Sequence, residues 1–128
     1  MIQSYVDNSL QPRAPISVLD KSANDALLDA VVDTGFIGDL CISIHEIPKI
    51  NLTFSHNGKF ELGNGAVVTQ PVYWGKVVFD KRVMTVKVVV STSRDTLIGA
   101  SLLADKKVEV DYPRRSVVIK SSKPRKKK

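Results

Sequence analysis

An aspartate, a threonine and a glycine follow one another at positions 33–35, directly after the largely apolar run Ala26–Val32. A strand that ends in this way presents a carboxylate at a sharp turn. Gly35 allows the backbone to turn closely, and the Thr34 hydroxyl can donate a hydrogen bond that fixes the loop. Peptide hydrolysis without a metal or a nucleophilic side chain needs an activated water and an acid, and two carboxylates about 3 Å apart that share one proton can supply both. The chain has one such motif. The second carboxylate would therefore come from a second copy of the chain.

Asp-Thr-Gly is also an ordinary turn sequence, in which Asp33 would only end a strand and cap the turn. The order of the surrounding features is more specific. A Gly-rich hairpin and a long β region follow the motif. A second apolar segment then ends in glycine, Thr96-Leu97-Ile98-Gly99, and Ser101-Leu102-Leu103 comes next.

The segments that would position these residues are almost all of β type, because apolar residues alternate or form short runs bounded by turn residues. Tight hairpin turns of type I′ are predicted at Asn57-Gly58 and Asn64-Gly65, and the strand after them is expected to be interrupted or bulged at Pro71 and Gly75. The predicted strands are Ile16–Leu19, Ala26–Val32, Leu40–Ile42, 66–79, Val83–Val90, Leu97–Ile98, Val108–Tyr112 and Val117–Ile119.

Turns are predicted at 20–25, 80–82 and 113–116. Helical structure is expected at two places only. Ser43 and Glu46 have the spacing of a capping box, and Pro48 should limit the helix that starts there. Residues Ala100–Ala104 are predicted to form a short helix.

Taken together, these features resemble the retropepsin-like aspartic proteases, the single-domain homodimeric relatives of pepsin. The sequence Asp33-Thr34-Gly35-Phe36 is similar to that of a bacterial and archaeal subgroup. Members of this subgroup also tend to begin as this chain does, with Met1-Ile2 and Val6-Asp7 before a first strand. The resemblance extends from residue 1 to about Ile119. It implies an all-β fold: a small closed β-barrel of the single pepsin-lobe type with one short helix, acting as a symmetric homodimer on a polypeptide substrate.

The resemblance also implies roles for individual residues. Asp33, Thr34 and Gly35 would form the catalytic loop, with Thr34 bonding across to the partner loop and Gly35 approaching the substrate. Leu97-Ile98-Gly99 would pack behind this loop. A flap that closes over bound peptide would lie near 63–66, although a plain surface hairpin is the alternative for Asn64-Gly65. The residues assigned to substrate binding are Phe36, Ile37, Gly63, Asn64, Gly65 and Ala66.

The chain departs from the retroviral members at two places. Phe36 stands where they usually have a small residue, and it would either crowd the substrate cleft or form a wall that sets specificity. Ala100-Ser101 stands where they often have an arginine that braces the dimer. Other contacts would then hold the dimer, such as pairing of the terminal strands Ile2–Val6 and Val117–Ile119. Apolar candidates for lining the cleft, or for ordinary core, are Val31, Phe36, Ile37 and Val67.

Composition limits the alternatives. A chain of 128 residues suits one domain rather than the two-lobed pepsin architecture. No run is long enough to span a membrane, and the first residues do not form a signal peptide, so a cytoplasmic location is expected. The single cysteine, Cys41, is expected to be a small buried residue. His45 and His56 lack partners at metal-ligand spacing, and no phosphate-binding loop is present, so neither a metal nor a cofactor is expected.

The formal charge of +6 comes from the C-terminal end. Residues 120–128 hold six basic side chains and no acid, which leaves residues 1–119 with a formal charge of zero. We therefore expect a domain over 1–119 and a solvated, disordered basic tail over 120–128. The tail could touch nucleic acid, but a neutral folded body without a basic face argues against that function. A retropepsin-fold dimer that binds or assembles without proteolysis is the other alternative, because its sequence would look the same.

Overall fold

The structure is a computed structural model that describes residues 1–19, 25–50, 52–92 and 94–123. Within these residues the chain forms ten strands and one short 3₁₀ helix, η1, at Ile47–Lys49. The strands are β1 (Ile2–Val6), β2 (Pro12–Leu19), β3 (Asp25–Val32), β4 (Leu40–Ser43), β5 (Thr53–Glu61), β6 (Val67–Phe79), β7 (Arg82–Ser91), β8 (Leu97–Ile98), β9 (Lys106–Asp111) and β10 (Ser116–Ser121). None of the described helices is long and apolar enough to cross a membrane.

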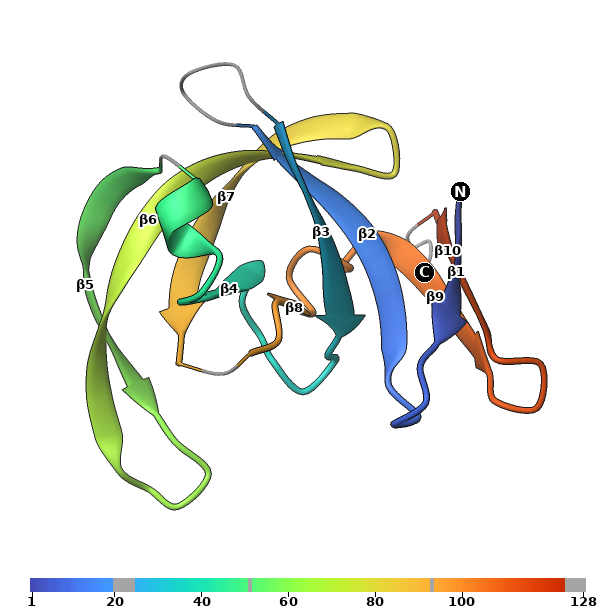
Figure 1. Cartoon of the computed structure of the whole chain (residues 1–128), viewed down its shortest axis with the longest axis horizontal. Coiled ribbons are helices and arrows are strands. Elements are labelled where there is room, and N and C mark those ends of the chain that lie inside the picture. Colours follow the sequence, from blue (N-terminus) through green and yellow to red (C-terminus); the bar gives the residue numbers. More distant parts are fainter. Residues whose placement is uncertain (20–24, 51, 93, 124–128) are drawn as a thin grey trace, which may run out of the picture.

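The strands form one sheet in the order β5-β6-β7-β4-β8-β3-β2-β1-β10-β9. An additional pairing between β6 and β2 joins the two arms of this sheet, so that the strands between them close into a ring. In Figure 1, β5 and β6 curve away on one side of the ring and the β9–β10 hairpin stands on the other. The prediction of an all-β, closed barrel-like fold is confirmed.

Alternation along the strands places the core inside the ring. In β2 the side chains of Ala14, Ile16 and Val18 are buried, while their neighbours are at least partly exposed. Phe79 of β6 and Leu40 of β4 are fully buried in the same core. Burial of these apolar side chains is the main force that holds the ring closed.

The predicted hairpin turn at Asn57-Gly58 is wrong, because β5 runs straight through both residues and pairs them with Pro71 and Gln70 of β6. Gly58 instead lets the Phe60 and Val72 side chains pack closely against the backbone. A Cβ on it would lie 2.9 Å from the Phe60 ring and 3.1 Å from Val72. The expected interruption of β6 is also wrong. The register shift lies in β5, between Phe54 and His56. Pro71 is tolerated because β6 pairs with β7 only from Val72 onward.

The hairpin at 62–66 is confirmed, but its turn differs from the predicted type I′. Gly65 has a φ of 85° and its amide donates to the carbonyl of Leu62, at 2.9 Å, while the Leu62 amide donates to Ala66. This is a three-residue loop that ends in a left-handed glycine. Two consecutive positive φ values, which type I′ requires, occur instead at Asp80 (49°) and Lys81 (66°), between β6 and β7.

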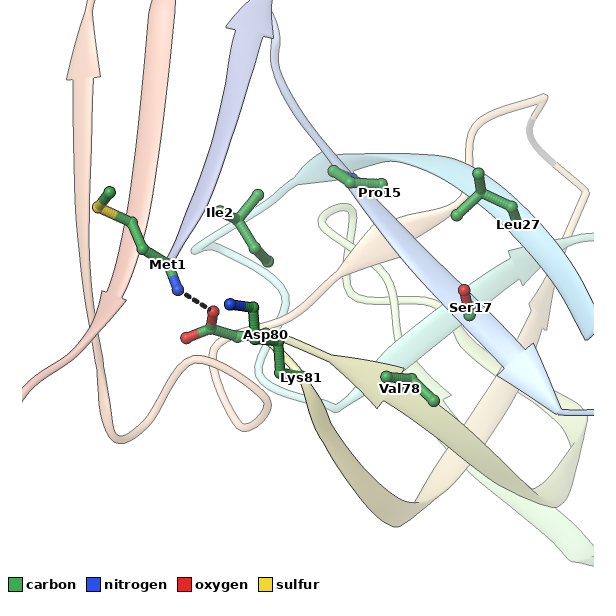
Figure 2. A pocket seen from close by; sticks show the side chains of 8 residues that line it. All are labelled: Met1, Ile2, Pro15, Ser17, Leu27, Val78, Asp80 and Lys81. Carbon is green, nitrogen blue, oxygen red and sulfur yellow. Dashed lines mark ion pairs between the residues drawn. The ribbon is translucent and has the colours of Figure 1, made fainter.

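Asp80 also ties the N-terminus to the barrel. Its carboxylate is only 4% exposed and lies 2.5 Å from the α-amino group of Met1 and 3.2 Å from the buried Lys106 ammonium. Figure 2 shows the Met1 contact beside a hollow of about 190 Å³, which Pro15 and Leu27 also line. These ion pairs join the N-terminus and the start of β9 to the β6–β7 turn, and they stabilise a turn that two non-glycine residues adopt at a cost.

The predicted helix at Ala100–Ala104 is wrong. Consecutive turns occupy this segment, with the Leu103 amide donating to Ala100 and the Lys106 amide donating to Leu103. The seven residues between the end of β8 and the start of β9 are too few to offset the cost of helix nucleation.

The helical turn expected from Ser43 and Glu46 begins later than predicted. Ser43 is the last residue of β4, and Glu46 precedes η1 without a side-chain capping bond. Pro48 lies within the first turn of η1, where its missing amide costs nothing. It therefore sits inside the short helix rather than ending a longer one.

The two terminal strands pair with each other inside one chain. Ile2 lies opposite Ile119 and Tyr5 opposite Ser116, and the other side of β10 is occupied by β9. β10 continues to Ser121, so it includes the first residues of the predicted tail. Of the predicted turn at 20–25, only Asp25 is among the described residues. The end of the tail, 124–128, lies wholly outside them.

Candidate functional site

The Asp33-Thr34-Gly35 loop begins where β3 ends. The Asp33 amide donates to the carbonyl of Ile98 at 2.9 Å, which extends the β3–β8 pairing by one residue. The Asp33 carbonyl accepts from Phe36 at 3.1 Å, and its carboxylate accepts from the Gly35 amide at 3.0 Å. Asp33 is half-buried, while Thr34 and Gly35 are exposed. The loop therefore holds one carboxylate in a fixed place at the molecular surface.

The segment after β8 lies directly behind this loop. The Gly99 amide donates to Asp39 at 2.9 Å and the Ala100 amide donates to Phe36 at 2.7 Å. A Cβ on Gly99 would lie 2.0 Å from the carbonyl oxygen of Gly38, so only glycine fits here. The structure thus places Leu97-Ile98-Gly99 where the resemblance implied, as backbone support for the loop.

A cavity of about 640 Å³ separates the loop from the β5–β6 hairpin. Residues of the loop and of β5 line it, together with residues of β6 and β7. Apolar and charged side chains are mixed in its lining. The cavity is lined by Gly35, Phe36, Ile37, Gly38, Asp39, His56, Gly58, Lys59, Phe60, Glu61, Val72, Lys87 and Val89.

Solved structures of known proteins share this architecture. A retropepsin-like aspartic protease from Rickettsia conorii is similar over 91% of this chain and 87% of that chain, with a TM-score of 0.59 at 17% identity. EIAV protease, in complex with the inhibitor HBY-793, is similar over 77% of this chain and 90% of that chain, with a TM-score of 0.59 at 15% identity. The chain has a retropepsin-like fold. No protein-family model and no curated protein matches the sequence.

In this retropepsin-like fold, strand register aligns a row of side chains on the face of the sheet that carries the cavity. Paired residues lie on the same face, so the row can be followed from strand to strand. Its middle members are small or aliphatic, and its two ends are Arg13 and His56. From β2 to β5 the row is Arg13, Val31, Leu97, Cys41, Val89, Val72 and His56.

The predicted substrate-binding residues fall into two groups. Phe36 and Ile37 line the cavity, and the Ile37 side chain is 82% exposed. Residues 63–66 form the hairpin tip, beyond the part of β5 that lines the cavity. Of the other cleft candidates, Val31 is buried within the sheet and Val67 is 64% exposed at the start of β6.

Sequence reasoning missed the wall that β5 contributes, including His56 and Phe60. The false turn at Asn57-Gly58 hid it, because that turn would have placed these two residues on different strands. Alternation through 56, 58 and 60 was the available signal, since it places all three on one face of β5.

Cys41 lies in the middle of the row and is buried, as predicted. Burial raises the pKa of its thiol, a hydrogen bond with Ser91 opposes this shift, and the negative charge of Asp33 adds to it. The thiol is therefore neutral at physiological pH, in the role of a small apolar side chain.

Asp39 and Lys87 join the loop to β7 beside the cavity. The Asp39 carboxylate accepts from the Lys87 amide at 3.1 Å, and the Lys87 ammonium lies 5.7 Å from the centre of the Trp74 ring. Among the residues that the structure describes, no three His, Cys, Asp or Glu side chains gather closely enough to hold a metal ion.

Proposed function

We propose that this protein is an aspartic endopeptidase that acts as a homodimer, with Asp33 contributed by each copy. The observation that carries this proposal is an Asp-Thr-Gly loop at the surface of a retropepsin-like fold, held from behind by β8 and adjoining a cavity that Gly35 and the residues after it line. Each of these features is needed for peptide hydrolysis, and together they favour it over a purely structural turn.

The chemistry follows from two carboxylates that lie close together and share one proton. The ionised Asp33 takes a proton from a bound water, whose oxygen attacks the carbonyl carbon of the scissile peptide bond. The protonated Asp33 of the other copy donates its proton to the carbonyl oxygen. The tetrahedral intermediate collapses as the first Asp33 gives its proton to the leaving nitrogen and the other Asp33 takes a proton back from a hydroxyl of the intermediate. The C–N bond breaks, which yields a carboxylic acid and an amine, and the pair again shares one proton.

One chain supplies one such carboxylate, so the site is complete only in a dimer. A two-fold axis beside the loop brings the Asp33 of one copy next to the Asp33 of the other, as any isologous interface does for a residue near the axis. Thr34 and Gly35 are exposed on the same loop, which leaves both accessible to the partner. In this role Thr34 bonds to the partner loop and Gly35 lies against the substrate backbone.

The substrate is a polypeptide that occupies the cavity between loop and hairpin. Phe36 and Ile37 contact it from the loop, and Gly63, Asn64, Gly65 and Ala66 cover it from the hairpin tip. Open space around Gly63 and Gly65, where an added Cβ would meet nothing within 4 Å, supports a tip that can approach a ligand. Closure of this tip would exclude water from the reaction.

The test is cleavage of a diverse peptide library at mildly acidic pH, with and without pepstatin. The expected result is cleavage that pepstatin abolishes, from a protein with the mass of a dimer. A dimer that binds peptides without cleaving them would instead favour the binding or assembly function. A protein that neither binds nor cleaves peptides would contradict the proposal.

A further inference from the structure

Arg13 connects three segments of the chain on the outer face of the sheet. Its guanidinium donates from Nε to the Asp7 carboxylate at 2.9 Å and from Nη2 to the Asp95 carboxylate at 3.1 Å. Its Nη1 also donates to the backbone carbonyl of Asp29 at 3.3 Å. The Arg13 side chain is 18% exposed. One side chain thus links the β1–β2 loop, β3 and the loop before β8.

Asp7 holds Arg13 from one side and is itself held firmly. Its carboxylate accepts from the amides of Ser9 and Gln11, at 2.8 and 3.0 Å. These hydrogen bonds, from the Gln11 amide first, and the hydrogen bond from the Arg13 guanidinium lower the pKa of Asp7. Asp7 therefore stays ionised near neutral pH and fixes the direction in which the guanidinium points.

Asp95 lies at the other end of this contact, one residue before the segment that supports the catalytic loop. The Val31 amide of β3 donates to the carbonyl of Thr96 at 2.8 Å. Two residues further along, the Asp33 amide donates to the carbonyl of Ile98 at 2.9 Å. β8 has only two residues, so its alignment with β3 depends on what holds its ends. β4 pairs with β8 on its other side, and the Gly99 contacts hold its C-terminal end. At its N-terminal end the Thr96 hydroxyl accepts from the Ser43 amide at 3.4 Å, and Arg13 adds a contact through Asp95.

We propose that Arg13 is a positioning residue for Asp33: its ion pair with Asp95 keeps β8 against β3, and β8 in turn keeps the Asp33 backbone in place. Its effect on catalysis rests on the proposed function, whereas its effect on the β3–β8 contact does not. Arginine suits this position because its planar fork can donate in several directions at once, which a lysine ammonium on the same stem cannot reproduce.

A matched control exists in the same chain. Arg82 and Asp105 form an ion pair with the same separation, 3.1 Å, but their side chains are 64% and 52% exposed. Such a pair contributes little in water. Neutralising it changes charge by the same amount as neutralising Arg13 or Asp95, without touching β3 or β8.

The first experiment measures amide hydrogen exchange by NMR in the full chain. Asp95→Asn is the mild variant, because Asp95 is 35% exposed, and Arg13→Gln is the stronger one. The expected result is exchange at the Val31 and Asp33 amides that is about tenfold faster or more, with β9–β10 amides unchanged. Unchanged exchange at both amides, or the same acceleration in Arg82→Gln, would overturn the proposal.

The second experiment measures peptide cleavage. Arg13→Gln and Asp95→Asn should each lower kcat by about tenfold or more, with KM nearly unchanged, and the double variant should be no worse than the poorer single one. Arg13→Lys should recover only part of the loss. A loss confined to KM, or additive losses, would count against positioning. If the wild-type protein cleaves nothing, the proposed function fails, and the exchange experiment alone decides the role of Arg13.

Discussion

Gly99 lies so close to Gly38 that a methyl group on its Cα would come within 2.0 Å of the Gly38 carbonyl oxygen. The same methyl would lie 2.7 Å from the Phe36 ring. The loop that carries Asp33 and the segment after β8 are therefore fitted backbone to backbone. Two stretches far apart in the sequence form one rigid unit at the site.

Gly99→Ala should separate these two segments. Neither a backbone carbonyl nor a packed ring can move away easily, so we expect a loss of about 3 kcal/mol in the free energy of unfolding, measured by urea denaturation. Gly63→Ala is the control, because an added Cβ there meets nothing within 4 Å, and it should change stability by less than about 0.5 kcal/mol. Equal effects of the two substitutions would show that the contact has no energetic importance.

Asp33→Asn should abolish peptide cleavage and leave the fold intact. The amide oxygen of asparagine can still accept from the Gly35 amide, so the loop keeps its shape, but the side chain can no longer accept a proton from water. Circular dichroism and thermal melting check the fold, and the peptide-library assay checks activity. Asp25→Asn, at the exposed start of β3, is the matched control and should stay active. Full activity of Asp33→Asn would refute the assignment of the catalytic carboxylate.

Asp80→Asn should destabilise the protein by about 3 kcal/mol. The substitution leaves the buried Lys106 ammonium without its counter-charge and removes the partner of the Met1 amino group. Asp105→Asn breaks an ion pair of similar length that is exposed to solvent, and it should cost less than about 1 kcal/mol. Chemical denaturation of both variants gives the comparison. A loss for Asp80→Asn no larger than that of the control would contradict the importance of burial.

Stability should fall steeply in acid. A hydrogen bond from the N-terminal amine, followed by one from Lys106, lowers the pKa of Asp80. Hydrogen bonds from the Gln11 amide and the Arg13 guanidinium lower the pKa of Asp7. Folding therefore favours the ionised forms. Their contribution is complete above the unfolded pKa, about 4, and is lost as pH falls through the folded values. Denaturation between pH 7 and pH 2 should show a plateau and then a decline that is smaller in Asp80→Asn. A variant with the wild-type pH dependence would rule out Asp80 as a source of the decline.

The sequence predicted the strands well because alternation and buried apolar runs are local signals. Leu97–Ile98 and Leu40–Ile42 were recognised in this way, although each is short. Turn types were predicted less well, because they depend on tertiary contacts. Asn57-Gly58 has the composition of a hairpin turn, yet Gly58 is required for packing against Phe60 and Val72. Asp80-Lys81 has an unremarkable composition, yet two ion pairs of the buried Asp80 carboxylate stabilise its geometry.

The site shows the same division between local and long-range information. The position of Asp33 and the support behind it could be predicted, since the motif and the glycine of 97–99 mark them. The row from Arg13 to His56 could not, because it depends on the register of seven strands, and an error of one residue would turn a side chain to the other face. Arg13 itself carries no sequence signal, since its partner Asp95 lies 82 residues further along the chain.

The last prediction concerns the dimer. The protein should have the mass of a dimer in solution, and Thr34→Ala should weaken association by about tenfold or more, because each of two symmetric loops would lose a hydrogen bond of about 1 kcal/mol. Thr69→Ala, at an exposed position on β6, removes the same hydroxyl away from the loop and should leave association unchanged. Sedimentation over a range of concentrations measures both, and cleavage should decline in step with the dimer fraction. A strict monomer that cleaves peptides at full rate would remove the mechanism, because one Asp33 cannot act as both acid and base on the same peptide bond.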